Sequence, residues 1–141
     1  MHSKQALILF VALLIISLSG VYYKNVNSPA PSQEKCDLSL GKCTFVYGDN
    51  EISVNFLSPI VTEEEILLTF ELPADTILTK AWIEGLNMFM GKTPIIEEAG
   101  RYVTFLGSCN LDRMDWQLNL MIENKNGQVT SYSAVFHTYN D

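Results

Sequence analysis

The sequence contains few of the groups that enzymes use for acid–base, nucleophilic or phosphate chemistry. Only two histidines are present, His2 and His137, and the first lies in the N-terminal tail. There is no His-x-x-x-His pair, no glycine-rich phosphate loop, no serine nucleophile turn and no Cys-x-x-Cys motif. We therefore predict that the protein is not an enzyme.

Basic residues are also scarce over most of the chain. All 16 acidic residues lie from Glu34 onward, where they face only seven of the nine lysines and arginines, so this part carries a net charge of −9. We expect it to bind neither nucleic acid nor anionic lipid by bulk attraction. The charge could favour cations or basic partners, although a solvated acidic surface is the simpler interpretation.

Charged residues are absent from positions 6 to 23, which are mostly apolar. As an α-helix these 18 residues would extend about 27 Å at about 1.5 Å each, which is enough to span a bilayer. Tyr22 and Tyr23 would then lie at the membrane interface. We predict a signal-anchor helix over residues 1–23, with a cleaved signal peptide as the alternative. In either case the rest of the chain is exported.

A polar segment, residues 24–35, follows and includes two prolines and two serines. It has too little apolar surface to offset the entropy of ordering, so we interpret it as a linker. The remaining residues, 36–141, would form one exported domain on the oxidising side of the membrane, a size typical of a single domain.

Three cysteines occur in this exported part: Cys36, Cys43 and Cys109. Thiols tend to pair in oxidising compartments. A bridge between Cys36 and Cys43 would close a short loop and stabilise the fold by about 2–3 kcal/mol. The sequence does not exclude a disulfide between Cys109 and either Cys36 or Cys43. With three cysteines, one is left outside any single intramolecular disulfide.

The exported part has the pattern of short strands separated by turn residues, with no convincing helix. Alternation is clearest over residues 51–57, and Asn126-Gly127 suits the turn of a hairpin. Trp82 and Trp116 are candidate core residues. We predict an all-β, seven-stranded immunoglobulin-like β-sandwich, with a small barrel as the alternative. The expected strands are residues 44–47, 51–57, 66–72, 77–86, 101–106, 116–123 and 129–138.

Two segments between strands contain methionine where small polar residues are usual. The first places Met88 and Met90 two residues apart between glycines, directly after a strand. In extended backbone such residues project to the same side, so both thioethers could reach one point. The second segment contains Cys109 and Met114. Because the loops of a sandwich gather at its two ends, both segments could share one end.

Soft sulfur ligands select Cu(I), whereas zinc prefers thiolate, imidazole or carboxylate. We therefore predict a Cu(I) site made by Met88, Met90 and Met114, with Cys109 as a fourth ligand if its thiol is reduced. The alternative is that these methionines fill gaps in the packing under the loops. His137 could add a ligand, although a surface position near the C-terminus is the simpler interpretation.

Three motifs occur in this order: Cys36-x-Leu-x-x-Gly-x-Cys43, Gly85-x-Asn-Met-x-Met-Gly91 and Cys109-x-x-x-x-Met-x-Trp116. Over nearly the whole domain this pattern resembles a family of small uncharacterised proteobacterial membrane-anchored periplasmic proteins. The resemblance implies a single span in the inner (cytoplasmic) membrane, a periplasmic domain, and an accessory role linked to copper and respiratory oxidases. The chain departs from the family at Leu106-Gly107-Ser108, where a Leu-Pro pair is expected before the second cysteine motif.

Two functions from different classes follow. The first is a non-enzymatic copper-binding or copper-handling domain, held by its anchor near a membrane partner such as an oxidase under assembly. The second is a metal-free structural or protein-interaction domain of the cell envelope. In that case the methionines and tryptophans would form core and an exposed patch, and the cysteines would pair for stability.

Overall fold

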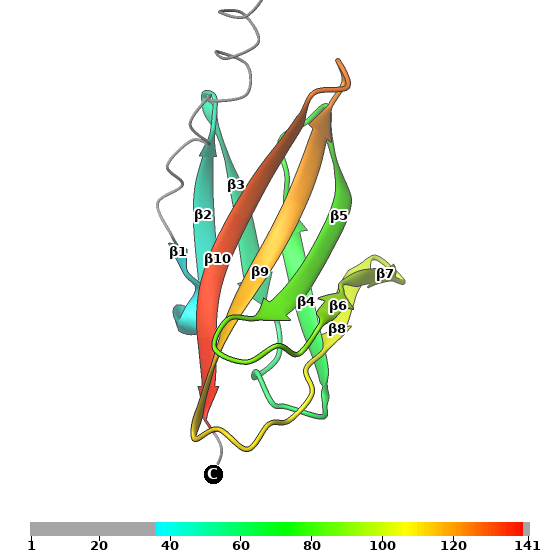
Figure 1. Ribbon diagram of the computed structural model, residues 1–141. Coiled ribbons are helices and arrows are strands. Elements are labelled where there is room, and N and C mark those ends of the chain that lie inside the picture. The colour runs from blue at the N-terminus through cyan, green and yellow to red at the C-terminus, as the bar shows by residue number, and fades with distance from the viewer. Residues whose placement is uncertain (1–35, 140–141) are drawn as a thin grey trace, which may run out of the picture. The chain divides into compact units, whose positions relative to one another are not determined.

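The described residues form ten strands in two five-stranded sheets (Figure 1). The structure is a computed structural model and describes residues 36–139. The predicted anchor (1–23) and linker (24–35) lie outside the described residues. Within residues 36–139 we find no helix with the length and apolarity needed to span a bilayer.

Each sheet contains strands from both the first and the second half of the domain. Sheet A has the order β1-β10-β9-β5-β6 and sheet B the order β2-β3-β4-β8-β7. All pairings are antiparallel except that of β1 with β10. Sheet A consists of β1 (Cys36–Asp37), β10 (Val129–Tyr139), β9 (Arg113–Asn124), β5 (Thr76–Gly85) and β6 (Lys92–Pro94). Sheet B consists of β2 (Lys42–Tyr47), β3 (Asn50–Phe56), β4 (Glu65–Glu71), β8 (Arg101–Phe105) and β7 (Ile96–Glu98).

The all-β prediction is confirmed, and each of the seven predicted strands is present. The predicted number is too low because β1, β6 and β7 are also strands. These three contain only two or three residues each, which is too short for an alternating pattern to be recognised. A single 3₁₀ turn, η1 (Leu38–Leu40), interrupts the strands near the start.

The core lies between the two sheets and follows from the alternation within the strands. In β9 every second residue from Met114 to Ile122 is buried. The Trp116 ring stacks on Phe136 with ring centroids 6.4 Å apart, and its indole Nε1 donates to Thr138 Oγ1 at 3.0 Å. Burial of the Trp116 indole therefore leaves no polar atom without a partner.

The prediction that Trp82 belongs to the core is wrong. Its neighbours in β5, Ala81 and Ile83, are buried, so the alternation of a strand turns Trp82 to the outer face of sheet A. There it is half-buried, and Lys92 Nζ lies 4.7 Å from its ring centroid.

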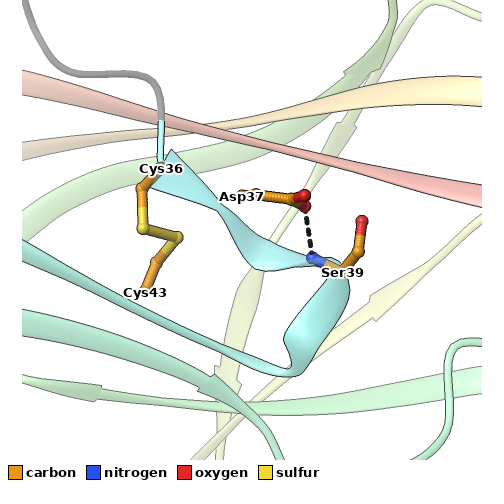
Figure 2. The surroundings of a disulfide bond; sticks show 4 residues. All are labelled: Cys36, Asp37, Ser39 and Cys43. Carbon is orange, nitrogen blue, oxygen red and sulfur yellow. Dashed lines mark hydrogen bonds between the residues drawn. A yellow bond between two sulfur atoms is a disulfide. The ribbon is translucent and has the colours of Figure 1, made fainter.

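A disulfide between Cys36 and Cys43 connects the two sheets, since Cys36 is in β1 of sheet A and Cys43 is in β2 of sheet B (Figure 2). This confirms the pairing expected from the short loop, and Cys109 is not part of it. The loop has its own turn: the Asp37 carboxylate accepts a hydrogen bond from Ser39 N at 2.9 Å. Hydrogen bonds from Ser39 lower the pKa of Asp37 below its usual 3.8.

Candidate functional site

The two methionine-containing segments lie at the same end of the sandwich, the lower end in Figure 1. One is the β5–β6 loop, residues 86–91, and the other is the β8–β9 loop, residues 106–112, with the start of β9. The prediction that Met114 lies between strands is wrong, because β9 begins at Arg113 and Met114 is one of its inward-facing residues. The β5–β6 loop starts against β9, where Leu86 N donates to Asp115 O at 2.8 Å. The β8–β9 loop is fixed to the β3–β4 loop through Glu63 N, which donates to Leu106 O at 2.7 Å.

Asn87 fixes the β5–β6 loop to β9 on both sides of Met114. Its side-chain Nδ2 donates to Arg113 O, and its Oδ1 accepts from Asp115 N, both at 3.0 Å. The amide thus replaces two missing main-chain partners at the point where β5 has ended. No role was assigned to Asn87 from the sequence. Its position next to Met88 in the Gly-x-Asn-Met-x-Met-Gly motif was the one feature that could have pointed to it.

Three residues of the predicted site meet at Gly85, the last residue of β5. A Cβ at this position would overlap both the Met88 carbonyl oxygen and the Met114 methyl carbon, and would lie 3.3 Å from Met90 Cγ. The backbone of Gly85 does not have a positive φ. Glycine is therefore needed here for space and not for conformation, and the space is occupied by groups from the candidate ligands.

Met90 extends from Gly85 toward the β8–β9 loop. A Cβ at Gly107 would lie 3.3 Å from the Met90 methyl carbon. Cys109, two residues further along this loop, is partly buried and, like Met90, packs against the hydrophobic core. The Met90 side chain thus reaches from the β5–β6 loop to Gly107 of the loop that contains Cys109.

Exposure differs strongly among the four predicted ligands. Met114 is buried at 2% exposure, Met90 and Cys109 are half-buried, and Met88 is 37% exposed. The structure brings Met90 and Met114 together at Gly85, while Met88 reaches this point with its main-chain oxygen. The candidate site therefore extends from a buried thioether to the surface of the β5–β6 loop.

His137 lies on the outer face of sheet A, away from Met114. It is opposite Asp115 in the β10–β9 register, whereas Phe136 and Met114 point into the core. Its Nδ1 is 2.9 Å from Ser39 Oγ. The surface interpretation of His137 is thus the correct one.

His137 lines a hollow of about 510 Å³ together with Asp37, Asn87, Arg113 and Asp115, among others. Arg113 Nε is 2.8 Å from Asp115 Oδ1, and this hydrogen bond and the Asp115 charge raise the pKa of Arg113. In the part of the chain that the structure describes, no group of three or more His, Cys, Asp or Glu side chains could hold a metal ion.

The fold and the site thus define a two-sheet, all-β domain whose candidate site consists of sulfur-containing side chains from two loops and the start of β9, at one end of the sandwich. Comparison of the chain with protein-family models, with curated proteins and with solved structures finds no match. The family resemblance drawn from the three motifs stays a prediction.

Proposed function

We propose that the protein is a non-enzymatic Cu(I)-binding domain of the periplasm, tethered to the inner membrane by residues 1–23. Met90 and Met114 would be the central ligands, Met88 a third, and reduced Cys109 a fourth. Its role would be to handle copper for a membrane partner such as a respiratory oxidase under assembly.

The convergence of Met90 and Met114 at Gly85 carries this proposal. Met90 comes from the β5–β6 loop and Met114 from β9, yet both side chains approach Gly85 in the space that a Cβ would fill. Thioethers need no deprotonation to bind a metal, and their softness favours Cu(I) over the harder cations.

The exposure gradient supplies a route for the metal. Met88 on the loop surface could receive Cu(I), and the half-buried Met90 could pass it to the buried Met114. Burial at the inner end would keep water away from the metal, which stabilises the reduced ion in an oxidising compartment. Transfer to a partner would use the same exposed end in reverse.

The strand order supports an immunoglobulin-like form of the sandwich. In that fold, one sheet has the order A-B-E-D and the other contains C, F and G. Here β3-β4-β8-β7 takes the first order, and β5, β9 and β10 take the places of C, F and G. In this assignment the candidate site would lie at the end of the sandwich that carries the E–F connection, opposite the B–C and F–G loops that bind antigen in antibody variable domains.

A Cu(I) titration of the full-length protein in detergent tests the proposal. Under anaerobic, reducing conditions with a coloured competing chelator, wild type should bind one equivalent. Met90→Leu and Met114→Leu keep the side-chain volume and should each weaken binding by at least about tenfold. Met121→Leu is the matched control, since Met121 is on β9 like Met114 but faces Ser131 of β10 and Lys80 of β5 in the register.

A second candidate function is the metal-free protein-interaction domain, and the β5–β6 loop favours it. Phe89 is 94% exposed and Leu86 is 50% exposed, so this loop presents apolar groups to solvent. Photo-crosslinking from position 89 in cells, with position 125 as control, would support this function if it captured one defined protein while the purified protein bound no Cu(I).

A further inference from the structure

An apolar row crosses the outer face of sheet B, away from the methionine site. Ile66 and Leu68 of β4 are buried, so Leu67 between them faces outward. In the register, Leu67 is opposite Val103 of β8, and Val103 is opposite Ile96 of β7. Ile96 is 54% exposed, so the row ends at solvent at the edge of the sheet.

A hollow of about 300 Å³ lies at this end of the row, at the small end of the size range of ligand pockets. Ile96, Val103, Phe105 and Pro94 contribute its apolar lining. Its floor is fixed by a hydrogen bond of 3.1 Å from Thr104 Oγ1 to Pro94 O, which connects β8 of one sheet to β6 of the other. The hollow is therefore a formed part of the fold.

The strand beside this hollow is the edge of its sheet. β7 is the outermost strand of sheet B and has only three residues, as Figure 1 shows at the right-hand side. An edge strand presents main-chain N–H and C=O groups that an extended peptide can pair with, while adjacent pockets accept its side chains.

The charge around the hollow indicates what kind of peptide fits. Glu65 and Glu98 line it and are exposed, and the chain from Glu34 onward carries a net charge of −9. A second copy of the chain would bring the same carboxylates toward one another, and an anionic lipid surface would be repelled. A segment with basic residues beside its apolar side chain would be attracted.

We infer that this hollow is a docking site for an extended segment of a partner protein, which pairs with β7, inserts one large apolar side chain among Ile96, Val103 and Phe105, and places basic residues next to Glu65 and Glu98. The inference is independent of copper, because none of these residues belongs to the methionine site.

The test uses the full-length protein in a zwitterionic detergent and a synthetic peptide in which lysines flank a central phenylalanine. NMR titration should give shifts concentrated at β7, β8 and the Pro94 region. A peptide with alanine in place of phenylalanine, and one with glutamates in place of lysines, should bind at least about fivefold more weakly. Failure of the lysine–phenylalanine peptide to bind, or shifts spread over both sheets, would overturn the inference.

Two charge-reversal variants separate docking from bulk attraction. Glu98→Lys should weaken binding of the peptide by about two- to fivefold, whereas Glu123→Lys makes the same change of net charge in β9 of the other sheet and should have little effect. Equal losses of affinity in the two variants would mean that binding is only bulk attraction, which would contradict the inference.

Ile96→Ser should weaken binding by about fivefold, independently of salt. Concentration-dependent self-association that Ile96→Ser abolished would assign the surface to a second copy and also overturn it.

Discussion

Replacing Gly85 by alanine tests whether the candidate site depends on close packing at the end of β5. The added Cβ would overlap the Met88 carbonyl oxygen and the Met114 methyl carbon. The methionine side chain can move aside, but the carbonyl belongs to a loop that Asn87 fixes to β9. The loop main chain must therefore shift, which typically costs about 1–3 kcal/mol.

A smaller, opposite effect comes from the unfolded state. Alanine restricts the unfolded chain and would stabilise the protein by about 0.4–1 kcal/mol if it fitted without strain. The net loss for Gly85→Ala is then about 1–2 kcal/mol, which corresponds to a fall in Tm of about 5–15 °C for a domain of this size. Displacement of Met88 and Met114 should also weaken Cu(I) binding by at least about tenfold.

Gly107→Ala is the matched control. Gly107 also lacks a positive φ, and a Cβ there meets only the methyl end of Met90 at 3.3 Å. This flexible side chain can yield, so Tm should stay within about 3 °C of wild type. Thermal unfolding followed by circular dichroism measures both variants. Equal Tm values for Gly85→Ala and Gly107→Ala would refute the packing argument.

Three further predictions concern the surroundings of the site. Asn87→Ala removes two hydrogen bonds and should cost about 1–2 kcal/mol, with faster hydrogen exchange in the first residues of β9. Reduction of the Cys36–Cys43 disulfide should lower the free energy of unfolding by about 2–3 kcal/mol, measured by urea denaturation, and replacement of both cysteines by serine should reproduce the loss without reductant. Because Ser39 lowers the pKa of Asp37, the stabilisation is present above pH 3.8 and is lost as the pH falls through the lower folded-state value. The urea midpoints of wild type and Asp37→Asn should therefore differ near neutral pH and converge in strong acid.

The long strands could be predicted because their residues alternate in a way that burial requires. In β9 the sequence pattern and the buried residues coincide from Trp116 to Ile122. The same reasoning would have placed Trp82 on the outer face of sheet A, because its neighbours Ala81 and Ile83 both face the core. The wrong prediction for Trp82 reflects attention to residue type in place of position in the strand.

The candidate site could be predicted only in part. Loop placement at one end of a sandwich follows from topology, so the proximity of the two methionine-containing segments was within reach. The approach of Met90 and Met114 to Gly85 depends on the missing side chain of that residue and on the Asn87 hydrogen bonds. These are long-range features that spacing along the chain does not reveal. The hollow beside β7 was missed for a related reason, since a three-residue strand leaves no periodic signal.

X-ray absorption at the copper edge tests the proposed coordination most directly. For the full-length protein loaded with one equivalent of Cu(I), we predict only sulfur neighbours in the first shell, near the length of about 2.3 Å known for zinc–thiolate bonds. Met114→Leu should lose sulfur from that shell, and Met121→Leu should leave it unchanged. A first shell of nitrogen or oxygen, or a sulfur shell that both variants leave intact, would contradict the assignment of copper to Met90 and Met114.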